Sequence, residues 1–261
     1  MNLSLEGRNA IVCGSSQGIG FAIAVELAIM GANCILLARN EDNLKTAVAQ
    51  LDISIRQSHS CHSIDFNDLA AVRALAKKVT AEQTIHILIN NSGGPKAGPI
   101  VDATEEEFLQ AFNQHLVVDH ILTNSVIEGM KKDGYGRIIN IISTSVKTPL
   151  KNLGVSNTIR WAVASWSKTM ANELGQFGIT VNNVLPGSTS TERNTFLIEA
   201  NATRLNISTE EVKKRMIEEI PAKRFGEPEE IAAVAAFLAT PAASYVNGVS
   251  IPVDGGRTPS I

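Results

Sequence analysis

The chain has 261 residues, of which 44% are hydrophobic and 19% are charged, and its formal net charge is −3. This composition excludes an intrinsically disordered chain and supplies enough apolar material for a sizeable core. The lack of a basic field and an aromatic content of only 5% argue against nucleic-acid binding. The sequence contains no run of about 18 apolar residues, so we expect no membrane-spanning helix. Three widely spaced cysteines indicate neither a disulfide framework nor a metal site. Without a visible export signal, we expect a cytoplasmic protein.

Short apolar runs alternate along the chain with segments of helical periodicity. Strands are predicted at 8–13, 33–38, 59–64, 86–90, 136–142, 179–185 and 249–253. Helices are predicted at 19–30, 42–51, 67–80, 105–132, 152–174 and 227–239, with Asn67 capping the third. This alternation predicts an α/β fold with a single Rossmann-type, doubly wound parallel sheet of about seven strands and helices on both faces.

No linker rich in proline or glycine divides the chain, so we expect one dinucleotide-binding domain over residues 1–261. The segment 188–223 breaks the alternation because it is long, polar and charged, with a helical stretch near 209–220. A long segment of this kind is typical of a lid over an active site, and a plain surface insertion is the alternative.

A glycine-rich turn follows the first predicted strand and opens the first predicted helix. It reads Gly14-Ser-Ser-Gln-Gly18-Ile-Gly20. Glycines allow close approach of a pyrophosphate, and the helix N-terminus offers unpaired N–H groups and a partial positive charge. In this position the turn predicts a dinucleotide site. A tight turn that binds nothing is the alternative.

The end of the second predicted strand distinguishes the two nicotinamide cofactors. An acidic residue there would bind the adenosine ribose 2′-hydroxyl, whereas an arginine would pair with a 2′-phosphate. The chain has Arg39 and no acid at this point, which favours NADP over NAD. The alternative is that Arg39 is a solvated residue at the entry to a helix.

At this point the chain resembles the short-chain dehydrogenase/reductase family, and within it the 3-oxoacyl-carrier-protein reductase-like branch. The likeness covers nearly the whole chain. It includes the glycine turn, Asn90-Asn91-Ser92-Gly93, the predicted strands around Ser143 and before Pro186-Gly187, and the segments 224–230 and 254–256. The resemblance and the turn together imply these cofactor-binding residues: Gly14, Ser16, Gln17, Gly18, Ile19, Gly20, Arg39, Asp65, Asn91, Gly93, Pro186 and Gly187.

The family's active site is an asparagine, a serine, a tyrosine and a lysine, and only the serine is retained here. Counting from the matched motifs places Ser143 at the serine position, Ser156 at the tyrosine, Arg160 at the lysine and His115 at the asparagine. The two tyrosines of the chain, Tyr135 and Tyr245, are not followed four residues later by lysine. We therefore expect an atypical active site made of His115, Ser143, Ser156 and Arg160, without a metal.

These replacements change what the site can do. Tyrosine, with an unperturbed pKa of about 10, can be tuned towards neutrality by a cation, whereas a serine hydroxyl is far too weak an acid. Arg160 stays protonated, although it can hold a ribose hydroxyl or an anionic group, and it shares a helix face with Ser156. His115, with an ordinary pKa near 6.5, could replace the missing acid or could be a packing residue.

Three functions remain open from the sequence. The first is an NADP-dependent oxidoreductase acting on a carbonyl or hydroxyl group of a small molecule. The second is a catalytically impaired NADP(H)-binding sensor or partner protein. The third is an acid/base enzyme, such as a dehydratase or isomerase, that uses His115. The basic residues of the segment 188–223 would suit an acidic substrate or a phosphopantetheine arm, but six glutamates offset them. The long helices predicted at 105–132 and 152–174 resemble those through which family members pair, so we expect a homodimer or homotetramer.

Overall fold

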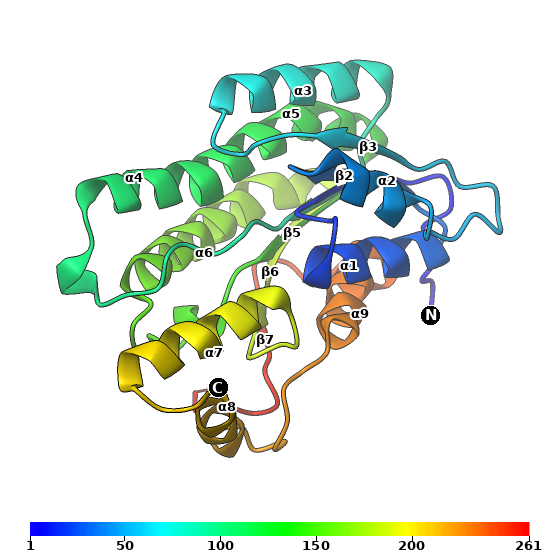
Figure 1. The fold of residues 1–261 in the computed structure, drawn as a ribbon. Coiled ribbons are helices and arrows are strands. Elements are labelled where there is room, and N and C mark those ends of the chain that lie inside the picture. Colours follow the sequence, from blue (N-terminus) through cyan, green and yellow to red (C-terminus); the bar gives the residue numbers. More distant parts are fainter. Residues whose placement is uncertain (261) are drawn as a thin grey trace.

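Strand β1, Asn9–Cys13, is an interior strand of the sheet. Its last four residues are buried, and it pairs in parallel with β2 on one side and β4 on the other. In the computed structural model, which describes residues 1–260, seven strands form one sheet in the order β3-β2-β1-β4-β5-β6-β7. All six pairings are parallel (Figure 1). The other strands are β2 Asn33–Ala38, β3 Ser60–Ser63, β4 Ile87–Asn90, β5 Gly136–Ile141, β6 Ile179–Pro186 and β7 Ser250–Val253.

Helices cover both faces of this sheet, and each face has its own apolar core. On one face α1 packs against α9, and Leu27 of α1 and Ile231 of α9 are fully buried. On the other face α3 packs against α5, and α6 packs against β6. Strands β1, β4 and β5 contribute side chains to both cores. Their apolar residues therefore follow one another without alternation, although β5 also buries Arg137 and Asn140. The helices of these two layers are α1 Gly18–Ile29, α2 Glu41–Val48, α3 Leu69–Glu82, α5 Val118–Asp133, α6 Gly154–Leu174 and α9 Pro228–Ala239.

The order of the strands reverses between β1 and β4. In a doubly wound sheet, such a switch point leaves a crevice at the carboxyl ends of the strands where ligands bind. The loops after β1, β4, β5 and β6 all open at this edge. The topology therefore brings together the glycine turn, the loop at 91–98, the loop at 142–153 and the segment after Pro186.

The predicted fold class is confirmed, and the differences lie at particular elements. The long helix predicted at 105–132 is divided into α4 Glu105–Phe112 and α5 by one turn of π-helix, Asn113–Val117. The prediction that Asn67 caps the third helix is wrong, because Asp68 is the N-cap and its side chain accepts a hydrogen bond from the Ala71 backbone N–H. Asn67 instead donates to Asp65.

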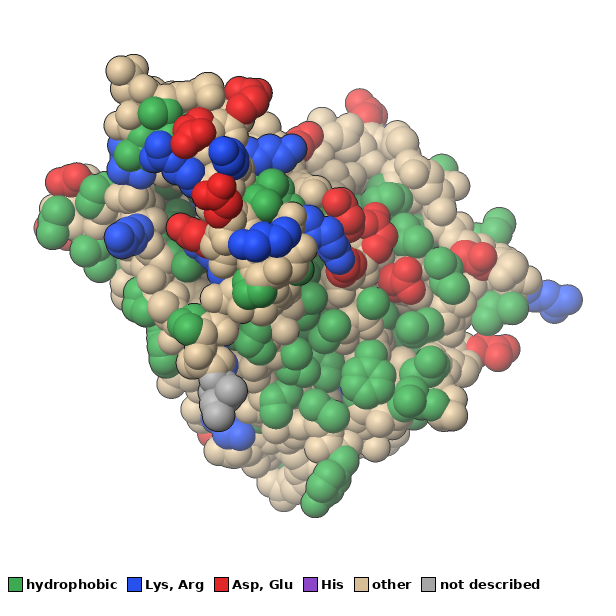
Figure 2. Space-filling view, turned by 90° about the horizontal axis from the view of Figure 1, so that it is seen from below, with side chains coloured by type: hydrophobic (Ala, Val, Ile, Leu, Met, Phe, Trp, Pro, Cys, Tyr) green, Lys and Arg blue, Asp and Glu red, His purple; other side chains and the backbone are tan. Residues whose placement is uncertain are grey.

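The segment 188–223 contains two helices, α7 Glu192–Leu205 and α8 Thr209–Glu218, of which the sequence analysis predicted only the second. Both helices begin with a side-chain cap, Thr191 for α7 and Ser208 for α8. Figure 2 shows basic and acidic side chains intermingled over the part of the molecule where α8 lies, so this surface has no single sign of charge. The lid role of this segment stays a prediction.

Within residues 1–260, no helix is both long enough and apolar enough to span a membrane.

Candidate functional site

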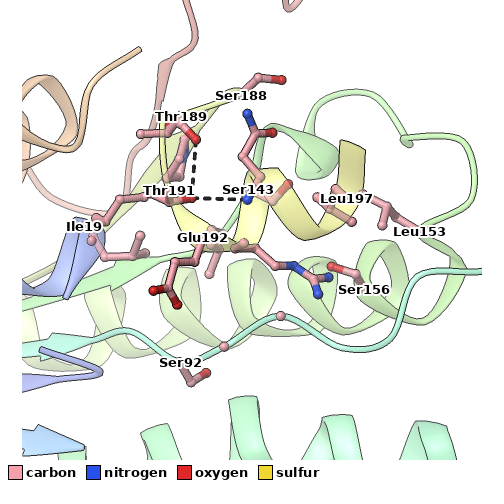
Figure 3. A pocket seen from close by; sticks show the side chains of 18 of the residues that line it. Ile19, Ser92, Ser143, Leu153, Ser156, Ser188, Thr189, Thr191, Glu192 and Leu197 are labelled. Atoms are coloured by element: carbon pink, nitrogen blue, oxygen red, sulfur yellow. Dashed lines mark hydrogen bonds between the residues drawn. The ribbon is translucent and has the colours of Figure 1, made fainter. Parts of the chain in front are cut away.

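A cavity of about 1260 Å³ opens at the carboxyl edge of the sheet, where the switch point lies. Its wall is built from the glycine turn, the ends of β2, β4, β5 and β6, the start of α6, and the segment 188–223 with α7. Figure 3 shows Ser188, Thr189, Thr191, Glu192 and Leu197 of this segment together with Ile19 and Ser156, and Ser92 lies on the strand-end loop below them. Residues far apart in the sequence therefore share one chamber.

The glycine turn is sterically obligatory in this fold. Gly14 has φ +57° and Gly18 has φ +58°, in the left-handed region that favours glycine. A Cβ at Gly14 would lie 2.7 Å from the carbonyl oxygen of Asn91, and one at Gly20 would collide with the carbonyl oxygen of Gly14. The turn thus presses closely against its neighbours and still leaves its outer side open to the cavity.

The loop after β4 holds the turn in place. The Asn91 side chain donates hydrogen bonds of 3.2 Å to the carbonyl oxygens of Cys13 and Gly14. Ser15 adds a second tie, because its hydroxyl donates to the Val12 carbonyl and accepts from the Leu37 backbone N–H. Three strands are therefore fixed relative to the turn before any ligand is present.

The end of β2 presents an exposed cation to the cavity. Arg39 lies directly after β2, lines the cavity and forms no ion pair within 4.0 Å to any of residues 1–260. The amide side chains of Asn40 and Asn43 line the cavity beside it, which the sequence analysis did not single out. Asp65 lines the same wall, and its carboxylate accepts from both nitrogens of Asn67.

The remaining candidates at this end also reach the cavity. All twelve residues predicted to bind the cofactor line this one chamber. Pro186 ends β6, and the Gly187 backbone N–H donates to the Val253 carbonyl, which fixes the far wall.

Three of the four predicted catalytic residues meet at the other end of the cavity. Ser143 follows β5, and its hydroxyl accepts a hydrogen bond of 3.0 Å from the Ser145 backbone N–H. Ser156 and Arg160 lie one turn apart on α6, both are buried, and both line the cavity with Ser143. One nitrogen of the Arg160 guanidinium, Nη1, donates to the Ile141 carbonyl at 3.1 Å, while Nε has no partner among the described residues.

The fourth candidate, His115, lies in the π-helical turn and does not line the cavity. It is 1% exposed, and its Nδ1 shares a hydrogen bond of 2.6 Å with the Ser92 hydroxyl. Burial lowers the pKa of His115 well below its ordinary value, and the charges of Arg160 and Arg193 lower it further. Burial therefore favours the neutral form of the imidazole. Whether it takes part in catalysis stays a prediction.

Both tyrosines lie away from this centre. The Tyr135 hydroxyl donates to the Ala239 carbonyl at 2.6 Å in a buried position, and Tyr245 is fully exposed. Neither lines the cavity, so no phenol among residues 1–260 can act where Ser156 stands.

Two charged residues near this centre were missed or undervalued from the sequence. Asp119 is buried on the first turn of α5, where burial raises the pKa of its carboxyl well above the ordinary value and the charge of Arg160 partly opposes this. Arg193, on the first turn of α7, is half-buried, lines the cavity and donates from Nη2 to the Pro95 carbonyl at 2.6 Å. A buried aspartate such as Asp119 on α5 carries no sequence signal, because an isolated acid on a helix is usually solvated.

Comparisons with known proteins agree with this geometry. A family profile described as enoyl-(acyl carrier protein) reductase matches residues 14–258. The chain is 33% identical to the 3-oxoacyl-[acyl-carrier-protein] reductase FabG of Vibrio cholerae over 258 residues, which covers 97% of this chain and 98% of the relative. It is also 33% identical to the NADPH-dependent reductase BacG of Bacillus subtilis over 260 residues, covering 97% of this chain and 99% of that protein.

Solved structures give the same result. The crystal structure of L-sorbose reductase from Gluconobacter frateurii, complexed with NADPH and L-sorbose, is similar with a TM-score of 0.92 and 29% identity, covering 100% of both chains. YwfH, an NADPH-dependent reductase involved in bacilysin biosynthesis, is similar with a TM-score of 0.91 and 31% identity, covering 97% of this chain and 99% of that one. With these matches over almost its whole length, the chain belongs to the short-chain dehydrogenase/reductase family.

Proposed function

We propose that this protein is an NADP-dependent oxidoreductase that interconverts a carbonyl and a hydroxyl group on a small-molecule substrate. The observation that carries the proposal is the single cavity in which the twelve cofactor candidates and Ser143, Ser156 and Arg160 meet. The relatives support it, since BacG and YwfH are named NADPH-dependent reductases and the sorbose reductase was crystallised with NADPH.

The residues present fit a dinucleotide phosphate. The turn at Gly14 and Gly20 leaves no room for side chains on its inner side, so backbone N–H groups at the start of α1 remain accessible to a pyrophosphate. Arg39 offers an unpaired guanidinium at the end of β2, where a 2′-phosphate would need a cation, and no acid stands at that point. NADP therefore fits better than NAD.

When bound, NADPH supplies a hydride to the carbonyl carbon of the substrate. The hydroxyls of Ser143 and Ser156 can donate hydrogen bonds to the carbonyl oxygen, and the charge of Arg160 favours the negative charge that develops there. None of these groups is a proton donor tuned to neutral pH, so the proton comes from water in the open cavity. Losing a tuned acid costs about 3–5 kcal/mol of barrier, which predicts slow turnover with ordinary ketones.

The position of the tyrosines supports a second candidate function. With no phenol in the cavity, the protein could bind NADP(H) as a sensor or as the partner of an active relative. A dehydratase or isomerase that uses His115 has less support, because this imidazole is buried and neutral and does not reach the cavity.

A titration with NADPH and NADH, followed by nicotinamide fluorescence, tests the proposal. We expect tight binding of NADPH, weaker binding of NADH and oxidation of NADPH when carbonyl compounds are added. Ser143→Ala should reduce the turnover number and leave the affinity for NADPH unchanged. Binding without turnover of any carbonyl compound would favour the sensor, and a failure to bind either nucleotide would contradict both functions.

Two further expectations concern assembly and location. Exposed apolar side chains on α4 and α6, namely Leu109, Phe112 and Trp161, support a homodimer or homotetramer, which light scattering on the purified protein would test. Free thiols at all three cysteines support a reducing compartment such as the cytoplasm.

A further inference from the structure

Two guanidinium groups converge on the substrate end of the cavity. Arg160 reaches it from α6 and is 7% exposed, and Arg193 reaches it from the first turn of α7. Each donates one hydrogen bond to a backbone carbonyl, Arg160 to Ile141 and Arg193 to Pro95. A guanidinium has five N–H donors, so most of the hydrogen-bonding capacity of this pair is unused.

No carboxylate of residues 1–260 forms an ion pair within 4.0 Å with either group. The acid next to Arg193 in the sequence, Glu192, instead accepts a hydrogen bond of 2.6 Å from the Gln17 side chain. Asp119 is close enough to influence the pKa of Arg160 but does not pair with it. Burying a charge without an oppositely charged partner is energetically costly. A bound anion would therefore stabilise this pair of guanidinium groups.

The charge of Arg193 also acts on Arg160. The pKa of Arg160 is lowered to about 10, chiefly by burial, while the charge of Asp119 opposes this shift and the charge of Arg193 adds to it. Burial likewise lowers the pKa of Arg193. Both groups stay charged at neutral pH and repel each other across the same space, and an anion between them would relieve this repulsion.

Resting on the proposed function, we propose that Arg160 and Arg193 bind the carboxylate of a small oxo acid or hydroxy acid whose reacting carbon lies beside Ser143 and Ser156. The planar fork of a guanidinium matches a carboxylate in two parallel hydrogen bonds. Ser156 lies one turn before Arg160 on α6, and Ser143, Ser156, Arg160 and Arg193 all line the same cavity, so we expect one compact molecule to meet all four side chains. An acyl thioester brings no negative charge to its reacting end and would leave both guanidinium groups unpaired.

The guanidinium of Arg193 packs against the backbone of Gly94. A Cβ built on Gly94 would lie 3.1–3.3 Å from the Nη2, Nε and Cζ atoms of Arg193, so the guanidinium rests against a residue without a side chain. Gly94 does not have a positive φ, which means that alanine is conformationally allowed there. Gly94→Ala would therefore push the guanidinium away from its position without removing its charge.

The test uses the complex with NADPH and paired probes. Pyruvate and acetoacetate are each compared with their methyl esters, with binding followed by nicotinamide fluorescence and turnover followed by NADPH oxidation. We expect the acid to bind about 10- to 100-fold more tightly than its ester, as for one lost charge-assisted hydrogen-bond pair. Arg193→Gln should bring this ratio close to one by weakening binding of the acid only, and Gly94→Ala should lower the ratio part of the way.

Arg204→Gln is the matched control, because Arg204 is a cation of the same helix that lines the same cavity but is exposed and bonded to Asn201. It should leave the ratio unchanged. Equal binding of acid and ester, no binding of either acid at millimolar concentration, or an unchanged ratio in Arg193→Gln would each overturn the inference. If NADPH itself fails to bind, the proposed function fails first. If NADPH binds and the acid preference is absent, the proposed function survives and the carboxylate subsite does not.

Discussion

The two ends of the cavity differ in how far they depart from the pattern of the family. At the cofactor end, the glycine turn, Asn91 and the residues after β6 keep the expected types. At the other end, the positions of His115, Ser156 and Arg160 all carry other residues than the family's asparagine, tyrosine and lysine. The cofactor end works through backbone groups, and a glycine whose Cβ would meet a carbonyl oxygen has no substitute. The substrate end binds through side chains. A side chain can be replaced by another type when neighbouring residues provide suitable hydrogen-bond partners.

A residue that contacts one of the replaced positions also departs from the family pattern. His115 shares a hydrogen bond with Ser92, and the family's loop has alanine at the position of Ser92. Two departures from the family pattern therefore share one hydrogen bond. Asp119 adds a buried carboxyl near Arg160. The charge of Arg160 influences the pKa of both His115 and Asp119, so the replaced side chains at this end affect one another.

The largest effect is expected from Ser156→Tyr combined with Arg160→Lys. This variant places a phenol and its cation on the cavity-lining face of α6, so turnover of a neutral ketone should rise about 100- to 10,000-fold through general acid catalysis. Initial rates of NADPH oxidation measure it. The matched control is Ser156→Phe with Arg160→Lys, which adds the same ring without the hydroxyl. An equal rise in the control would show that a change of packing, and not a proton donor, is responsible.

Gly20→Ala should damage the end that kept the pattern. The new methyl group would collide with the Gly14 carbonyl oxygen, so the turn must shift, and we expect the affinity for NADPH to fall about 100-fold or more. Fluorescence titration measures the affinity, and circular dichroism checks the fold. Gly98→Ala adds the same methyl group to another loop of the cavity where nothing lies within 4 Å. It should leave the affinity unchanged, and a similar loss there would contradict the steric argument.

Arg39→Ala should separate the two nicotinamide cofactors. Removing this guanidinium deletes charge-assisted hydrogen bonds to a 2′-phosphate, so the affinity for NADPH should fall about 10- to 100-fold. The affinity for NADH, which lacks that phosphate, should stay the same. A parallel loss for both nucleotides would mean that Arg39 supports the local backbone and does not select the cofactor.

The sequence predicted the features that depend on neighbouring residues in the chain. It did not predict those that depend on contacts between residues far apart in the sequence. All seven strands were predicted, and β2 was predicted with its bounds. Apolar runs gave most of them, because buried parallel strands need no partner information to be apolar, whereas β3, Ser60–Ser63, is polar and is not buried. Helix α7 was missed, since its polar sequence gives no apolar stripe and its start depends on the Thr191 cap. The π-turn at His115 was also missed. This turn lies between α4 and α5 in one continuous stretch of helix, and nothing in the sequence pattern marks it. Such turns often occur at functional sites.

Candidate residues followed the same division. The cofactor residues could be counted from motifs because the turn and strand ends are local features. Arg193 was seen only as one charge in a mixed segment, since neither its bond to Pro95, 98 residues earlier, nor its seat on Gly94 leaves a mark in the sequence. The low pKa of His115 has the same origin, because desolvation depends on what surrounds a group in space.

The smallest effect concerns stability, and His115→Asn tests it. An ordinary histidine in the unfolded chain has a pKa of about 6.5, whereas burial lowers the pKa of His115 in the folded protein. Below about pH 6.5 the unfolded chain therefore binds a proton that the folded chain does not, and the free energy of unfolding falls by up to about 1.4 kcal/mol per pH unit. Urea unfolding at pH 7.5, 6 and 5 measures this slope.

His115→Asn should flatten that slope, because asparagine does not titrate. Other groups with shifted pKa values, such as Asp119 and His86, are present in both proteins and cancel in the difference. His115→Gln, which also lacks a titrating group, should flatten the slope to the same extent. If His115→Asn keeps the wild-type slope, the imidazole is protonated in the folded state, and the acid role that the structure argues against would have to be reconsidered.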